Sequence, residues 1–247
     1  MTAAVSLDEY FSVLQRSNAP TLVVEGDDDY LAFREFEVEN IDKGLTIFPV
    51  TGKNNVLSII ARRDQIPNPR LVFLLDMDEW SFCGAAPYDQ LGWVILTNGW
   101  SIENDLLRDG AIERLMTRPE RDRFECEKER FAVVFSAALH CKVTGNDGPN
   151  ISTHPNQVLD RHGNLRFGIE EQMVEPFDNE DCLAHLRQDL MRYLRGKSLL
   201  QLCTRQLSRP GRQSNFSKAN LLEICAAARG PNIRRIEQEA LEALFQL

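Results

Sequence analysis

Acidic residues stand at the ends of two apolar runs in this chain of 247 residues, where a strand would give way to a loop. Glu25 follows the run 21–24, and Asp76 and Asp78 follow the run 71–75. In an open α/β sheet, ligands bind at the carboxyl ends of the strands, so we expect these three side chains to meet at one sheet edge. The Asp-x-Asp spacing helps, because alternate residues of an extended segment point the same way.

Two further acids extend this group. Asp29 comes about one helical turn after Glu25, and Glu103 lies just beyond a fourth apolar run. Carboxylates at one edge repel each other unless a cation lies among them. Oxygen ligands suit Mg²⁺ or Mn²⁺, which commonly keep waters and substrate phosphate oxygens as further ligands. Because such a metal polarises a phosphoryl oxygen and activates water, the pattern predicts a divalent-metal site for phosphodiester chemistry.

The elements that must position these acids alternate between strand and helix. Short apolar runs without alternation predict strands covered on both faces, at residues 21–24, 45–50, 71–75 and 93–96. Apolar residues at helical spacing predict helices at residues 7–14, 28–36, 54–63 and 101–107. Ser101 is a good N-cap for the last of these helices. This order predicts an α/β fold with a mostly parallel, doubly wound sheet.

The pattern changes near residue 111, which divides the chain into an α/β domain at 1–110 and a mainly helical region at 111–247. Long helices are expected at 119–142 and 179–208, with a β-hairpin at 158–167 that turns at Gly163-Asn164. A polar connector at 208–216 leads to two short helices at 218–228 and 233–245. We expect the helical region to bind nucleic acid and a partner.

The formal net charge of −9 hides an uneven distribution. Residues 1–110 contain 8 basic and 18 acidic residues, whereas residues 185–235 contain 11 basic residues and only two acidic ones. A basic stretch beside an acidic half is typical of a metal site with a separate phosphate-binding surface, although a solvated helix face would give the same count. The residues expected to contact nucleic acid are Lys53, at a helix N-terminus, and Arg195, Lys197, Arg205 and Arg209.

The remaining composition narrows the class of protein. The six cysteines are scattered without a Cys-x-x-Cys pair, which fits reduced thiols in a cytoplasmic protein, and the four histidines lack metal-ligand spacing. No apolar run approaches the ~18 residues of a membrane span, and the first residues lack the features of a signal peptide. We therefore expect a soluble protein with no membrane partner.

The order strand-Glu-Gly, then strand-Asp-x-Asp, resembles the TOPRIM domain, the metal-binding fold of topoisomerases, DnaG-type primases and OLD-family nucleases. The match runs over residues 23–29 and 74–78. More narrowly, the chain resembles the TOPRIM effector nucleases of PARIS-type anti-phage systems, which act beside an ABC-type ATPase. The motifs that carry this resemblance are Glu25-Gly26-x-x-Asp29, Thr51-Gly52-Lys53-Asn54-Asn55-Val56, Ser101-Ile102-Glu103-Asn104 and Leu194-Arg195-Gly196-Lys197. It covers residues 1–110 well and the helical remainder thinly.

This resemblance implies roles for the acids. Glu25 would be the catalytic acid/base or a metal-linked carboxylate, Asp76 and Asp78 the metal ligands, and Asp29 and Glu103 supporting acids. It also implies a Mg²⁺-dependent endonuclease, a ribonuclease rather than a deoxyribonuclease, that cleaves tRNA and is toxic to the host. An ATPase partner would restrain it until infection, and the active form would self-associate as a homodimer.

Other functions fit parts of the same pattern. The TOPRIM-like domain could be a non-catalytic module that assembles with the ATPase. Asp76-Met77-Asp78 also resembles the motif of haloacid-dehalogenase-type phosphatases, but Trp80 stands where a Thr normally follows. Gly52-Lys53 does not complete a Walker A motif, because Ile47 and Asn54 occupy positions that need Gly and Ser or Thr.

Overall fold

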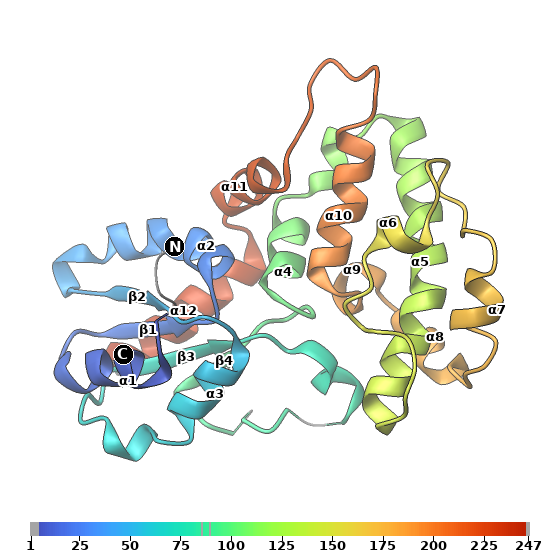
Figure 1. Cartoon of the computed structure of the whole chain (residues 1–247). Coiled ribbons are helices and arrows are strands. Elements are labelled where there is room, and N and C mark those ends of the chain that lie inside the picture. Colours follow the sequence, from blue (N-terminus) through green and yellow to red (C-terminus); the bar gives the residue numbers. More distant parts are fainter. Residues whose placement is uncertain (1–4, 85, 89, 246–247) are drawn as a thin grey trace.

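Four parallel strands form one sheet in the order β2-β1-β3-β4 in the computed structural model, which describes residues 5–84, 86–88 and 90–245. The strands are β1 (Thr21–Val24), β2 (Thr46–Pro49), β3 (Leu71–Leu75) and β4 (Val94–Leu96). All four expected strands are therefore confirmed, and β1 and β3 have the predicted bounds. The chain is a mixed α/β fold (Figure 1).

Helices cover both faces of this sheet. Consecutive residues of a strand point to opposite faces, and the two hydrophobic cores follow that alternation: Leu22 and Leu74 belong to one core, and Val23 and Phe73 belong to the other. The first core includes residues of α2 (Asp27–Glu39), and the second includes residues of α1 (Leu7–Arg16) and α3 (Lys53–Ile60). Burial on both faces explains why these strands are continuously apolar.

The strand order creates a switch point between β1 and β3. From β1 the chain passes to β2 on one side, and then returns to β3 on the other side of β1. The loops that leave the carboxyl ends of β1 and β3 therefore diverge and leave a crevice, which is where open α/β sheets bind ligands. Glu25 follows β1 directly and Asp76 follows β3 directly, so both acids lie at this point.

Helices from the second half of the chain extend the core, and one of them contacts the sheet. The long helix α5 (Arg118–Thr144) packs beside α10 (Gly196–Leu207), whereas α12 (Pro231–Phe245) returns to contact β3 and β4 (Figure 1). The core that contains Leu22 also contains Phe131 of α5 and Leu199 of α10, so it continues past residue 110. Although α5 has 27 residues, no helix in the described part of the chain is long and apolar enough to cross a membrane.

The remaining elements are short. They are α4 (Ile102–Asp109), α6 (Pro155–Val158), α7 (Ile169–Met173), α8 (Glu180–Leu186), α9 (Leu190–Tyr193), α11 (Lys218–Ala228) and four 3-10 turns at Ile41–Lys43, Arg63–Gln65, Asp78–Phe82 and Ile112–Leu115. The helices expected at 101–107, 119–142, 218–228 and 233–245 are confirmed as α4, α5, α11 and α12.

Two predictions in the helical region are wrong. Residues 179–208 form three helices (α8, α9 and α10) rather than one, because the Asp189 side chain caps α9 by accepting from the Arg192 amide and the backbone of Leu194 is extended. The expected hairpin at 158–167 is reduced to a single antiparallel bridge between Leu159 and Leu165. It cannot extend, because Val158 ends the short helix α6.

Candidate active site at the carboxyl ends of the strands

Carboxylates tie β1, β3 and α4 together at the switch point. Glu25 Oε1 accepts a hydrogen bond from the Asp76 backbone amide at 2.8 Å. Asp76 Oδ1 accepts one from the Ile102 amide at 3.0 Å. Ile102 is the first residue of α4, where backbone N–H groups have no partner within the helix and favour a negative charge. The positions of these two acids are thus set by two backbone amides, one just after β3 and one at the start of α4.

The predicted acids line two pockets that share residues. Glu25, Asp29, Asp76 and Glu103 line a pocket of about 440 Å³, together with Lys197 and six other residues. A smaller pocket of about 140 Å³ repeats Glu25, Asp76, Glu103 and Lys197 and adds Asp78, Arg195, Trp100 and Ser101. The structure therefore brings together all five acids that the sequence singled out, and it places two of the expected basic residues beside them.

Burial makes Glu25, Asp29 and Asp76 hard to ionise. It is the main cause that raises the pKa of Glu25 to about 7, and the charges of Asp78 and Glu103 add to it, against the hydrogen bond from Asp76 and the charge of Lys53. Burial and the neighbouring carboxylates also hold the pKa values of Asp29 and Asp76 well above the ordinary value. Asp29 is 5% exposed, and its buried Oδ1 has no hydrogen-bond partner among the described residues. A cation in the pocket would relieve this repulsion.

Asp78 differs from the other acids because it has a positive partner. Lys53 Nζ lies 2.7 Å from Asp78 Oδ2, donates to the Asp76 carbonyl at 2.8 Å and packs over the Trp80 ring at 3.7 Å. Asp78 itself has φ +47°, an uncommon value for a residue other than glycine, and its amide donates to the Trp100 carbonyl at 2.7 Å. Lys53 therefore pairs with an acid of the site, whereas the sequence predicts that it contacts a phosphate of the nucleic acid.

The argument that placed Asp76 and Asp78 on one side of an extended segment is wrong. β3 ends at Leu75, and a 3-10 turn begins at Asp78, so the two acids are not alternate residues of one strand. They share the smaller pocket because the turn brings Asp78 back toward Asp76.

The segment before α10 packs tightly against the start of α4. Asn104 Nδ2 donates to the carbonyls of Met191 and Leu194 at 2.8 Å and to that of Arg192 at 3.2 Å. A Cβ at Gly196 would lie 2.3 Å from Ser101 Oγ, so only glycine fits there. The two motifs 101–104 and 194–197 therefore contact each other.

This contact sets the place of the two basic residues. It puts Arg195 and Lys197, on either side of the glycine, next to the carboxylates. Lys197 is exposed and Arg195 is half-buried, so both can reach a ligand in the pocket.

Arg205 and Arg209 are not brought to the carboxylates. Arg205 is half-buried and joins α10 to α5 through Glu127, with 2.7 Å between Nε and Oε2, and it also donates to the Asp160 carbonyl. Its guanidinium is occupied by internal partners, which indicates a structural role. Arg209 lies beyond the end of α10 and lines other pockets. The expected basic surface is therefore divided between two places.

Sequence reasoning missed the residues that position the site. Asn104 and Gly196 lie inside motifs that were singled out, but their contact joins segments about 90 residues apart and has no local signal. Trp80 was considered only as a departure from a phosphatase motif, whereas it packs on Lys53.

The donor set fits a hydrated metal ion better than a closed cage. Within residues 5–84, 86–88 and 90–245, no three His, Cys, Asp or Glu side chains are arranged as a metal centre. Mg²⁺ usually takes only one or two carboxylates and keeps several waters, so an acidic pocket with an unpartnered buried oxygen on Asp29 suits it. No protein-family model and no curated protein matches the chain. The geometry and chemistry of this pocket are therefore the basis for assigning a function.

Proposed function

We propose that this chain is a Mg²⁺- or Mn²⁺-dependent endonuclease of the TOPRIM type that hydrolyses phosphodiester bonds of RNA, with tRNA as its substrate. One observation carries the proposal: half-buried carboxylates from the ends of β1 and β3 and buried ones from α2 and α4 converge at the switch point, with Arg195 and Lys197 beside them. Acids that are costly to ionise favour a divalent cation, and the two basic residues favour a phosphate next to it.

Each side chain has a role in this chemistry. Asp76 and Asp78 would hold the metal directly, and Asp29 and Glu103 would support it through its bound waters. The metal would supply polarisation of the phosphoryl oxygen and activation of water. The Asp76 amide holds Glu25 Oε1, which leaves Oε2 to take up and release a proton. Without a metal, burial and the neighbouring carboxylates raise the pKa of Glu25 to about 7, so this carboxyl holds a proton more readily than an ordinary Glu. Arg195 and Lys197 would bind the phosphate oxygens, and Lys53 orients Asp78.

The decisive experiment compares the wild-type chain with Glu25→Gln in cleavage of tRNA, unstructured RNA and DNA, with Mg²⁺, Mn²⁺ or EDTA. Glu25→Gln keeps the shape but loses the acid, so we expect cleavage to fall by about 10²-fold or more. Glu35→Gln is the matched control, because Glu35 is exposed on α2, away from the pocket. Metal-dependent cleavage by the wild type that Glu25→Gln retains, or no cleavage of any substrate, would contradict the proposal.

The cellular role belongs to the same proposal and rests on the sequence resemblance. It makes the nuclease a toxic effector of anti-phage defence that an ABC-type ATPase restrains and that dimerises when active. Expression in cells separates this role from a non-catalytic interaction module. If wild type and Glu25→Gln arrest growth equally and neither cleaves nucleic acid, the chain acts as an interaction module.

A further inference from the structure

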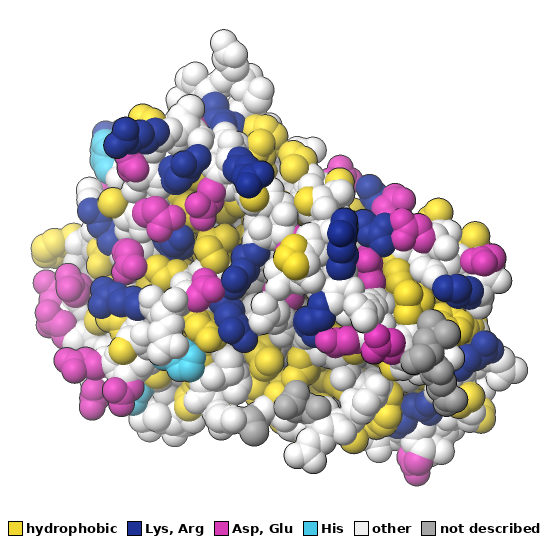
Figure 2. Space-filling model, turned by 180° about the vertical axis from the view of Figure 1, so that it is seen from behind, with side chains coloured by type: hydrophobic (Ala, Val, Ile, Leu, Met, Phe, Trp, Pro, Cys, Tyr) yellow, Lys and Arg dark blue, Asp and Glu magenta, His cyan; other side chains and the backbone are white. Residues whose placement is uncertain are grey.

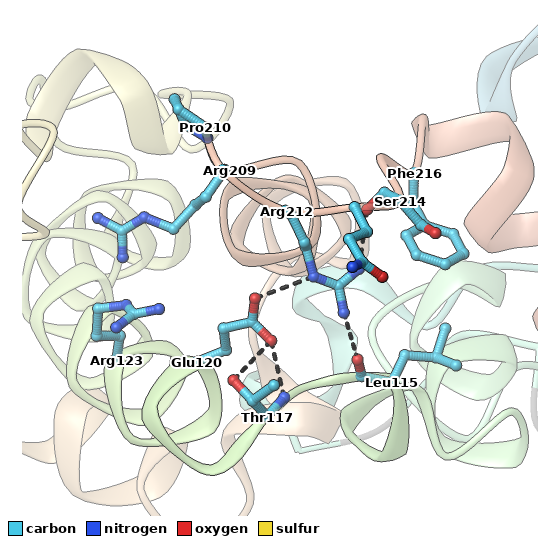
Figure 3. Close-up of a pocket in the computed structure, with 11 residues that line it drawn as sticks. Leu115, Thr117, Glu120, Arg123, Arg209, Pro210, Arg212, Ser214 and Phe216 are labelled. Carbon is cyan, nitrogen blue, oxygen red and sulfur yellow. Dashed lines mark hydrogen bonds and ion pairs between the residues drawn. The ribbon is translucent and has the colours of Figure 1, made fainter.

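A second pocket lies at the end of α10 opposite the carboxylates (Figure 3). Its volume is about 720 Å³, and it lies between the first turns of α5 and the connector 208–216. None of its lining residues lines the two acidic pockets. Because α10 has 12 residues and starts beside the carboxylates, the second pocket lies roughly 18 Å from them along the helix axis.

One ion pair fixes the shape of this pocket. Arg212 Nε lies 3.0 Å from Glu120 Oε1, the guanidinium also donates to the Leu115 carbonyl, and it packs over the Phe216 ring. Burial opposes ionisation of Glu120, but the hydrogen bonds from Thr117 and Arg212 outweigh it and hold the pKa below its ordinary value. Glu120 is therefore charged, and Arg212 neutralises it while anchoring the connector to α5.

Two other arginines in the pocket have no acidic partner within the described part of the chain. Arg123 Nε and Arg209 Nη1 both donate to the same amide oxygen of Gln206, each at 3.4 Å, and Figure 3 shows the two arginines extending toward each other. Gln206 is fully buried, and its amide nitrogen has no hydrogen-bond partner among the described residues. Glu120 is the one acid among the lining residues, and it already forms an ion pair with Arg212.

The guanidinium groups of Arg123 and Arg209 therefore both lie beside a neutral atom, the amide oxygen of Gln206. Two guanidinium groups close together repel each other, and an anion between them would remove that repulsion. Arginine forks match phosphate oxygens in geometry and form strong charge-assisted hydrogen bonds with them. Figure 2 shows several Lys and Arg side chains, with Asp and Glu side chains among them, below the projecting tip that the connector forms.

We propose that Arg123 and Arg209, held by Gln206, bind a backbone phosphate of the RNA substrate at a distance from the bond that is cleaved. This inference rests on the proposed nuclease function. A span of roughly 18 Å along α10 is longer than a four-base-pair stem, which extends at most roughly 14 Å at 3.4 Å or less per base pair. The pocket therefore makes binding depend on the length of the substrate. RNA too short to span α10 cannot bind the carboxylate site and the second pocket at the same time.

The test measures RNA binding against salt in the Glu25→Gln protein, which does not cleave. Losing one phosphate contact makes the slope of log K against log[salt] shallower by about 0.7 to 0.9. We expect this shallower slope for Arg123→Gln and Arg209→Gln with an RNA stem of about twelve base pairs. With a stem of about four base pairs, we expect the same slope as without these substitutions. Arg209→Lys keeps the charge and should retain most of the slope. Arg34→Gln, an exposed arginine on α2, is the control and should change nothing.

Two outcomes would overturn the inference. The first is an unchanged slope and affinity for the long stem in folded Arg123→Gln and Arg209→Gln proteins. The second is wild-type binding of inorganic phosphate that both variants lose while RNA binding stays intact, which would make this a site for free phosphate. Failure of the nuclease proposal would be seen separately, as absent metal-dependent cleavage by the wild type while the two variants still reduce the slope.

Discussion

Replacing Gly196 with alanine tests the contact that joins α10 to the carboxylates. The added methyl would lie 2.3 Å from Ser101 Oγ and 2.6 Å from Asn104 Oδ1. Both neighbours are buried and already engaged: Ser101 Oγ donates to Glu103, and the Asn104 amide donates to three carbonyls. Neither side chain can turn away without losing these bonds, so α10 itself must shift.

The magnitude follows from two opposing effects. Inserting a methyl into a packed site costs about 1–3 kcal/mol. Replacing glycine with alanine at Gly196, the first residue of α10, gives back about 0.4–1 kcal/mol, because the unfolded chain loses freedom. We therefore expect Gly196→Ala to lower the free energy of unfolding by about 1–2 kcal/mol. The shift of α10 should also displace Lys197 and Arg195 and reduce cleavage by more than the loss of stability explains.

Urea unfolding of the wild type and Gly196→Ala, followed by tryptophan fluorescence, measures the first effect. Gly92→Ala is the matched control, because Gly92 is exposed and a Cβ there would meet nothing within 4 Å. It should leave the midpoint within about 0.5 kcal/mol of the wild type. A Gly196→Ala protein as stable as Gly92→Ala, with full cleavage activity, would refute the close contact of α10 with α4.

Three further predictions concern charge. Because folding raises the pKa of Glu25 to about 7, the folded protein binds more protons than the unfolded chain above pH 4.5, so the free energy of unfolding falls as pH rises toward 7. Glu25→Gln should make the decrease in unfolding free energy between pH 4.5 and pH 7 smaller by up to about 3 kcal/mol. Urea unfolding of the wild type and Glu25→Gln at both pH values measures this, and an equal decrease in the two proteins would contradict the prediction. Mg²⁺ should raise the melting temperature more at pH 8 than at pH 6, since the ligands must lose protons, and Asp76→Asn should abolish the rise. Arg205→Met should cost about 3–5 kcal/mol by leaving buried Glu127 unpaired, whereas Arg187→Met, in an exposed pair, should cost less than about 1 kcal/mol.

The sheet and its acids were predictable because their signals are local. The run 71–75 is continuously apolar, which indicates a strand buried on both faces, and Asp76 ends it abruptly. Strand order then brings Glu25 and Asp76 together, since parallel strands share their carboxyl edge. The position of the site was therefore predictable from the ends of the strands. The turn at Asp78 was not.

The helical region was less predictable because tertiary contacts override its local preferences. Residues 179–208 have no proline or glycine until Gly196, and they read as one helix. The structure breaks them, and the carbonyls exposed at the second break bind Asn104. Charge was equally ambiguous: Arg205 and Arg209 are four residues apart, yet one is held by Glu127 and the other faces a pocket. A count of basic residues does not show which of them form ion pairs with buried acids inside the protein.

The bonds from Asn104 to residues 191–194 also affect when the proposed site is completed during synthesis of the chain. Every acid of the site has left the ribosome once residue 103 has, but the partners of Asn104 follow 87 to 90 residues later. At about 5–20 residues per second, the carboxylates wait several seconds for α10 to seat against them. A chain interrupted in that interval has the complete acidic set without Arg195 and Lys197, so under the proposed nuclease function a truncated translation product should not cleave RNA.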